Sequence, residues 1–170
     1  MYVPKKTKIQ IRNAIRQMYS EYRVGQFLKT NENKYKGVII CGPDYYIVNK
    51  LELREFTNSI NLPGKNIYTT TVGDWGGYTN GLYFGTIKNL ILILNRYQYL
   101  NKYLPTNNNY EQILKKSFVN NNVNRLKSSL IFFKIRSNKE IRWAGNENDK
   151  NKVKNRKEIE FKLKKISDSL

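Results

Sequence analysis

Histidine is absent from this chain of 170 residues, and cysteine occurs once, as Cys41. The missing imidazole excludes histidine-based acid–base catalysis and histidine-activated nucleophiles. Zinc and the softer transition metals lose their usual ligands as well, so we expect no metal site and no cofactor. A single cysteine cannot form a disulfide within the chain, which suits a reducing compartment. A globule of this length can hide about 70% of its unfolded surface in one core without such cross-links.

Acidic residues are scarce too: 13 Asp and Glu stand against 31 Lys and Arg, a formal net charge of +18. Such a field attracts a polyanion, because each phosphate neutralised by Lys or Arg releases condensed counterions. Nucleic acid is the favoured partner, and an anionic membrane surface is the competing one. The longest apolar run, residues 89–94 with its flanks, is far shorter than the ~20 residues of a transmembrane helix. We therefore expect no membrane span.

Asn, Lys, Ile and Tyr are abundant, as is typical of an AT-rich coding sequence. This composition indicates an organellar genome or an AT-rich organism. Arg12, Arg16 and Arg23 on an amphipathic helix allow a transit peptide, whereas Glu21 and the small number of serines argue against one. An organelle-encoded protein needs no such address.

Apolar residues spaced three or four apart predict helices, and short apolar, β-branched runs predict strands. The helices are expected at residues 5–23 (apolar face Ile11, Ile15, Met18 and Tyr22), 49–60 (capped by Asn49), 110–118 and 146–170. The strands are expected at residues 35–41, 66–72, 89–94 and 129–135, with a loop and a short helix at 97–109. Because helices alternate with strands that are apolar on both faces, the sequence predicts an α/β fold with a parallel sheet flanked by helices.

The sequence predicts that the chain consists of two regions. Residues 1–34 are expected to form a basic N-terminal helix and arm, whose charged side is either a solvated face or an RNA-facing one. Residues 35–170 are expected to form the α/β domain, which ends in a basic C-terminal helix at 146–170.

The glycine-rich residues 73–81 follow the second predicted strand, where open α/β sheets place their working surface. Small residues let backbone amides approach an anion, and Trp75 or Tyr78 is suited to stack on a base or ribose. Neither the P-loop ending nor the Gly-x-Gly-x-x-Gly fingerprint is present, so a nucleotide enzyme has little motif support. A tight structural loop with Trp75 packed into the core stays open as the alternative.

The segment after the last predicted strand carries Arg142 ahead of residues 145–149. Its acidic and amide residues are expected to cap the final helix. Glu147 and Asp149 as paired catalytic carboxylates are the weaker alternative, because no second polar cluster is at hand to orient a substrate. Cys41, at a strand end, is expected to fill the core. We therefore expect no catalytic residues.

The order of these segments resembles the ribosomal protein S-two family, the second universal protein of the small ribosomal subunit, particularly its mitochondrial members. Residues 36–40 are similar to the family's first strand, and 89–93 to its strand of the Asp-Leu-Ile-Ile kind. Trp75-Gly76-Gly77-Tyr78-Thr79-Asn80 resembles its signature with two residues deleted. Residues 129–135 and 144–149 resemble a later strand and the Pro-Gly-Asn-Asp-Asp opening of its last helix.

The resemblance covers roughly residues 35–165 and lies in the ordered set of motifs. The family's early Gly-His-x-Gly-His segment and its bacterial coiled-coil insertion have no counterpart. Arg136-Ser137-Asn138 stands in place of its Asp-Thr-Asn loop. We expect either a shortened protein or one part of a split gene, with a separate chain supplying the N-terminal portion.

The resemblance implies a flavodoxin-like parallel sheet and a structural role without catalysis. The chain would bind small-subunit rRNA between head and body, beside other ribosomal proteins, in a mitochondrial ribosome. An α/β nucleotide-binding enzyme acting on RNA and a basic membrane-surface protein are the alternatives. The residues expected to contact RNA are Trp75, Gly76, Gly77, Tyr78, Thr79, Asn80, Lys88, Arg142, Lys152, Lys154 and Arg156.

Overall fold

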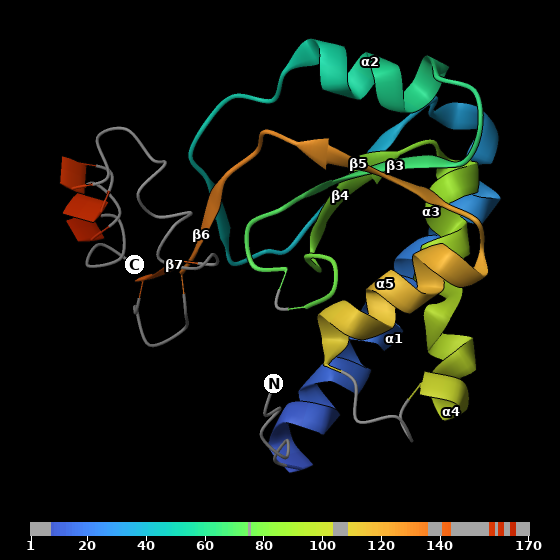
Figure 1. Ribbon diagram of the computed structural model, residues 1–170, viewed down its shortest axis with the longest axis horizontal. Coiled ribbons are helices and arrows are strands. Elements are labelled where there is room, and N and C mark those ends of the chain that lie inside the picture. Colours follow the sequence, from blue (N-terminus) through green and yellow to red (C-terminus); the bar gives the residue numbers. More distant parts are fainter. Residues whose placement is uncertain are drawn as a thin grey trace.

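A mixed sheet of four strands, covered by helices on both faces, forms the centre of the molecule (Figure 1). The computed structural model describes residues 8–74, 76–103, 109–135 and 141–143, and residues 157, 158, 160, 161, 164 and 165 near the C-terminus. None of the described helices is long and apolar enough to cross a membrane. The elements are α1 (Lys8–Thr30), η1 (Glu32–Lys34), β1 (Val38–Cys41), β2 (Tyr45–Ile47), α2 (Leu53–Asn61), β3 (Asn66–Thr70), β4 (Leu82–Gly85), α3 (Ile87–Leu94), η2 (Asn95–Tyr99), α4 (Leu100–Tyr103), α5 (Tyr110–Asn120), β5 (Asn124–Ser128), β6 (Phe132–Ile135) and β7 (Ile141–Trp143).

The four-stranded sheet has the order β1-β4-β3-β5. Strand β4 pairs antiparallel with both β1 and β3, and only β3 and β5 run parallel. The α/β class is confirmed, but the predicted wholly parallel sheet is wrong. The physical reason is β4, which follows the glycine-rich loop directly and so returns beside β3 without a helical crossover. A separate antiparallel sheet has the order β2-β6-β7.

Residues 89–94, predicted as a strand, lie in helix α3. Thr86 caps this helix by accepting a hydrogen bond from Asn89 N at 3.2 Å. Ile87, Leu90 and Ile93 are buried at helical spacing against the sheet. A short run that is apolar on every side fits a buried helix as well as a strand, so the sequence pattern alone could not decide between them.

Asn49 is not a helix cap, because α2 begins later, at Leu53. Its side chain instead accepts a hydrogen bond from Ile131 N at 2.8 Å and donates one to the Ser129 carbonyl at 3.0 Å. Asn49 therefore ties the segment before α2 to the segment before β6. The strand predicted at 129–135 is shortened to β6, and the strand predicted at 35–41 is only partly buried in β1.

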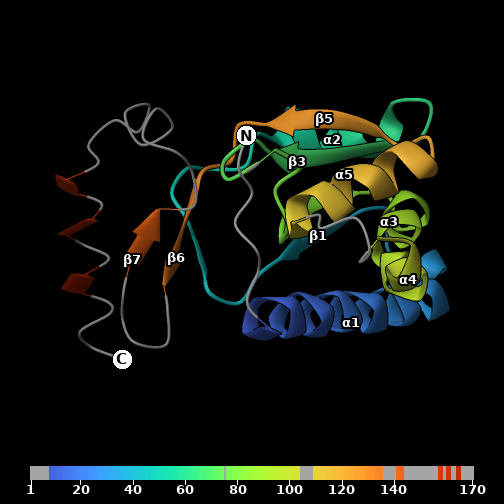
Figure 2. The ribbon, with the colours of Figure 1, turned by 60° about the horizontal axis from the view of Figure 1, so that its bottom comes forward.

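The two faces of the sheet are covered by different helices. Ile67 of β3 and Tyr83 of β4 belong to a core with α3 and α5. Tyr68 and Phe84 point to the other face, where their rings stack with centroids 5.0 Å apart and Phe56 of α2 packs on them. Figure 2 shows α2 on one side of the sheet and α1 on the other.

Helix α1 is confirmed and continues to Thr30. Its buried positions include Met18, Gly25 and Leu28, whereas Ile11 of the predicted apolar face is 38% exposed. The predicted face was centred too near the N-terminus, because Glu21, a charged residue, lies on the buried side.

Glu21 belongs to a buried polar network that we call the Glu21–Arg96 cluster, with Tyr83 and Tyr110 as its other members. One oxygen of Glu21 accepts hydrogen bonds from Arg96 and from the Tyr83 hydroxyl, and its other oxygen accepts from Tyr110 Oη at 2.7 Å. Arg96 also donates to the Ile93 carbonyl at 2.8 Å. Burial raises the pKa of Tyr83 and of Tyr110 far above the usual phenol value, so both hydroxyls stay protonated donors. The cluster joins α1, β4, η2 and α5.

Replacing Arg96 by Met should destabilise the fold by about 3–5 kcal/mol, because it leaves the buried Glu21 carboxylate without its counter-charge. Urea unfolding followed by circular dichroism measures this change. The matched double variant, Arg96→Met with Glu21→Leu, should lose less stability than the two single variants added together. Additive losses would show that the two charges do not depend on each other.

Candidate functional site

The glycine-rich segment folds into a closed loop between β3 and β4, with Asp74 and Thr79 at its neck. Asp74 Oδ1 accepts a hydrogen bond from Thr79 N at 2.8 Å, and the Thr79 hydroxyl lies 2.6 Å from the Val72 carbonyl oxygen. The Asp74 carbonyl accepts from Gly77 N at 2.6 Å. These bonds close the loop on itself.

Arg125 of β5 fixes this neck to the sheet. Its guanidinium donates to both oxygens of Asp74, at 2.7 and 2.8 Å, and to the Thr70 carbonyl at 2.8 Å. Its Nε donates to Thr69 Oγ1 at 2.6 Å, and its Cζ lies 4.3 Å from the centroid of the Tyr78 ring. Bidentate charge-assisted pairs of this kind are among the strongest side-chain hydrogen bonds. Arg125 therefore has an internal role.

Helix α5 holds the outer part of the loop. The Glu111 carbonyl accepts a hydrogen bond from Tyr78 N at 2.9 Å, and the rings of Tyr78 and Phe118 form a T-shaped pair with centroids 5.1 Å apart. A Cβ atom on Gly77 would overlap the backbone of Glu111. Glycine is thus required at position 77 by the close approach of two backbones.

The side chains expected to meet RNA in this loop are largely turned inward. Thr79 and Asn80 are 2% and 8% exposed, and Gly77 is buried. The ring of Tyr78 is engaged by Arg125 and Phe118, whereas Gly76 is exposed at a φ of 81°. Trp75 lies outside the described residues. The loop thus has the internal bonding of a tight structural loop.

Two of the remaining predicted contacts, Lys88 and Arg142, lie on elements that the structure describes. Lys88 is exposed in the first turn of α3, and Arg142 lies on β7, paired in register with Lys134 of β6. Helix α3 and strand β7 lie at opposite ends of the molecule (Figure 1). Lys152, Lys154, Arg156 and most of the predicted helix at 146–170 fall outside the described residues. Of the residues that the structure describes, Lys88 and Arg142 are therefore not brought into one site.

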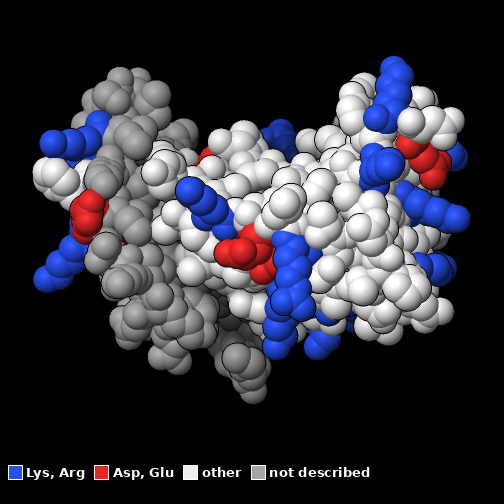
Figure 3. All heavy atoms as spheres, turned by 90° about the horizontal axis from the view of Figure 1, so that it is seen from above, with Lys and Arg blue, Asp and Glu red and all other residues white. Residues whose placement is uncertain are grey.

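Basic side chains outnumber acidic ones on the visible surface. Figure 3, which looks onto the side of the molecule that carries α2, shows many more Lys and Arg side chains than Asp and Glu, spread over separate elements. This excess of basic side chains makes the electrostatic potential of the surface positive.

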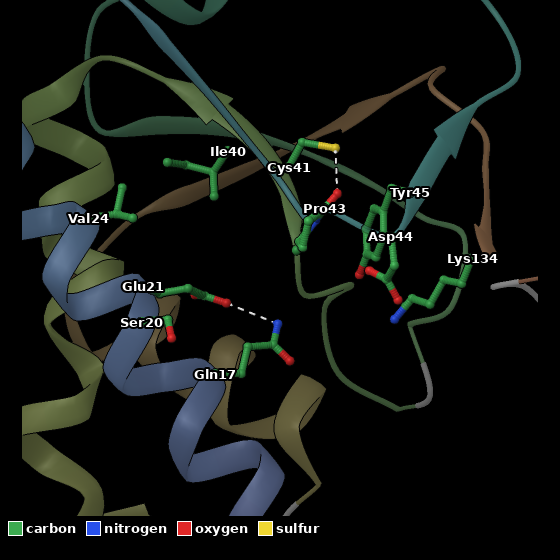
Figure 4. A pocket seen from close by; sticks show the side chains of 12 residues that line it. Gln17, Ser20, Glu21, Val24, Ile40, Cys41, Pro43, Asp44, Tyr45 and Lys134 are labelled. Carbon is green, nitrogen blue, oxygen red and sulfur yellow. Dashed lines mark hydrogen bonds between the residues drawn. The ribbon is translucent and has the colours of Figure 1, made fainter. Parts of the chain in front are cut away.

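A cleft of about 380 Å³ separates α1 from the turn between β1 and β2 (Figure 4). Gln17 and Glu21 line it from the helix, Cys41 from the end of β1 and Asp44 from the turn. Cys41 is exposed here, so its expected place in the core is wrong. Partial burial of the thiol and the neighbouring Asp44 carboxylate raise the pKa of Cys41, whereas a catalytic cysteine needs a lowered one. The cleft therefore lacks an activated nucleophile at this position.

The described residues contain no group of three or more His, Cys, Asp and Glu side chains that could hold a metal ion. No family model matches the chain, and no curated protein or solved structure matches it either.

Gly77→Ala should lower the thermal unfolding midpoint by about 5 °C or more, because the new methyl group would meet backbone atoms of α5 that cannot move alone. Gly37→Ala is the matched control. Its added Cβ would lie 2.8 Å from Cγ1 and Cδ1 of Ile60, which are side-chain and not backbone atoms, so we expect a smaller loss. Equal midpoints for the Gly77 variant and the unmodified chain would contradict the packing of α5 on the loop.

Cys41 should react with iodoacetamide more slowly in the native chain than in the urea-unfolded chain at the same pH near 8. A raised pKa leaves less thiolate at that pH, and the thiolate is the reactive species. Mass spectrometry reads the rate at a single position, because the chain has one cysteine. A faster reaction in the native chain would contradict the environment described for Cys41.

Proposed function

We propose that this chain is a structural, non-catalytic constituent of an organellar small ribosomal subunit and that it binds small-subunit rRNA. The observation that carries the proposal is that the excess positive charge lies on exposed side chains of several elements. The ion pairs Glu21–Arg96 and Asp74–Arg125 each remove one charge of either sign, so they leave the excess of +18 unchanged. Among the described residues, exposed cations lie on α1, α2, α3, α5 and β5. A surface of this kind suits a partner that contacts several faces at once, as folded RNA does.

The ordered motifs support the ribosomal part of the proposal. The sequence from Trp75 to Asn80, which resembles the S-two signature, lies between strands β3 and β4. The parallel pairing of β3 with β5 is the support for a flavodoxin-like relationship. Helix α3 removes one correspondence, because residues 89–93 do not form the strand that the resemblance requires. A mitochondrial location, a position between head and body and contacts with neighbouring ribosomal proteins belong to the same proposal.

Nucleotide binding by the glycine-rich loop is disfavoured by its bonding. A phosphate-binding loop needs backbone amides that point at the ligand. Here the amides of Gly77, Tyr78 and Thr79 all donate hydrogen bonds within the protein. A membrane-surface role is disfavoured by α1, because its buried apolar residues Met18 and Leu28 are packed in the core and cannot enter a bilayer.

The proposal predicts that the chain sediments with small ribosomal subunits in a sucrose gradient, where mass spectrometry identifies it. The purified chain should bind small-subunit rRNA fragments with an affinity that falls steeply with salt. We expect a slope of about −5 in a plot of log K against log salt, as for six or more phosphate contacts. Its absence from purified subunits, or an affinity for rRNA that does not respond to salt, would contradict the proposal. A nucleotide screen by thermal shift is the control, and no stabilisation is expected.

A further inference from the structure

Helix α1 carries a row of arginine and aromatic side chains along its solvent side. The members are Arg12, Arg16, Tyr19, Arg23 and Phe27, and we call them the α1 stripe. Their spacing of three or four residues places them on one helical face, over a length of about 22 Å. All five are exposed, Tyr19 by 44% and Phe27 by 61%.

One member of the stripe has a described ring contact with the rest of the fold, because the Tyr19 ring meets the Tyr97 ring edge to face with centroids 5.2 Å apart. The opposite face of α1, with Met18, Glu21 and Leu28, is the one that is buried. Gly25 on that face comes so close to α3 that an added Cβ would lie 3.0 Å from Leu94. Figure 2 shows the sheet and the other described helices on one side of α1. A lone exposed phenylalanine is ordinary on a protein surface, but Phe27 lies on the same helical face as three arginines.

The charge on this face is uncompensated along the helix. The single acidic residue of α1 is Glu21, and it is buried beside Arg96. Arg12 and Arg16 are four residues apart and repel each other, which slightly weakens an isolated helix. The described partner of Arg23 is the Tyr19 hydroxyl, to which its Nη1 donates at 3.4 Å. The α1 stripe thus keeps three cations that local helix stability does not favour.

We infer that the α1 stripe binds an unpaired segment of RNA. Arg12, Arg16 and Arg23 contact the phosphates, because a guanidinium matches phosphate oxygens with paired donors. Phe27 and Tyr19 stack on bases, which only an unpaired strand presents to aromatic faces. Binding of unpaired RNA is inferred from the α1 stripe itself. The further statement that this RNA is rRNA rests on the proposed function.

The aromatic members favour RNA over other polyanions. A membrane headgroup layer would pair with the arginines, but α1 has turned Met18 and Leu28 into the protein. Beside Phe27 it offers a bilayer only Ile11, Tyr19 and Val24, each less than half exposed. An acidic protein would leave the flat faces of these rings without a matching surface. Cations combined with exposed aromatic rings are the arrangement used to bind single-stranded nucleic acid.

Fluorescence anisotropy of the full chain with a labelled, unstructured RNA oligomer tests the inference, with the matching duplex as the comparison ligand. The variant Arg12→Gln, Arg16→Gln, Arg23→Gln should bind the oligomer at least tenfold more weakly, with a salt slope shallower by about 2. Phe27→Ala should weaken oligomer binding by about tenfold and leave duplex binding nearly unchanged.

The control variants remove equal charge or an equal kind of ring elsewhere on the surface. The first is a triple variant, Lys36→Gln, Lys50→Gln, Lys127→Gln, and the second is the single variant Tyr35→Ala. All four positions are exposed and lie outside α1. Each should bind the oligomer within about threefold of the unmodified chain. Thermal unfolding of every variant verifies that the fold is intact, and glutamine preserves the helical propensity of α1.

Three results would overturn the inference. They are equal losses from the stripe and control triples, an unchanged affinity of Phe27→Ala for the oligomer, and displacement of the RNA by anionic liposomes that bind through the same arginines. Sedimentation separates this inference from the proposed function. A chain found in small subunits whose stripe variants bind RNA normally would overturn the stripe alone. A chain absent from subunits whose oligomer binding depends on the stripe would overturn only the ribosomal assignment.

Discussion

The buried ion pair between Glu21 and Arg96 is the constraint on which the arrangement of this molecule depends. Two charges removed from water must face each other, and Tyr83 and Tyr110 complete the carboxylate's hydrogen bonds. Glu21 therefore has one orientation, toward η2 and the sheet. Because α1 is a rigid helix, this orientation also determines what the opposite side presents. The arginines and Phe27 face solvent as a consequence of where the single acidic residue of the helix is buried.

A second ion pair acts in the same way at the other side of the core. Asp74 and Arg125 close the glycine-rich loop, and the loop amides donate to the protein. The backbone amides of a glycine-rich turn can donate hydrogen bonds either to a bound anion or to groups of the protein itself. Here the Asp74 carboxylate accepts one of these bonds, from Thr79 N, in place of a bound anion. The loop positions β4 beside β3 and receives α5, so its contribution to function is the geometry of the surrounding surface.

Local patterns predicted the elements that local physics controls. The basic helix, the strand at β3 and the helix at α5 follow from periodicity and capping over a few residues, and each is present. The prediction of a strand at 89–94 was wrong because this segment is apolar both on the side of α3 that is buried against the sheet and on its other sides. The helical spacing of its apolar residues is therefore not visible in the sequence. Strand β4 was missed because the three residues between Gly81 and Gly85 are too few to show an alternating pattern. Its antiparallel pairing with β3 makes the sheet mixed.

The sequence by itself determined the charge of +18, the absence of imidazole chemistry and the spacing of Arg12, Arg16, Tyr19, Arg23 and Phe27 along one helix. Only the tertiary structure decided which side of that helix meets solvent and whether the loop at Gly77 is open to a ligand. The reason is distance along the chain. Composition and helical spacing are local properties, whereas the partner of Glu21 lies 75 residues away and that of Asp74 lies 51 residues away. Neither partner can be identified until the chain has folded.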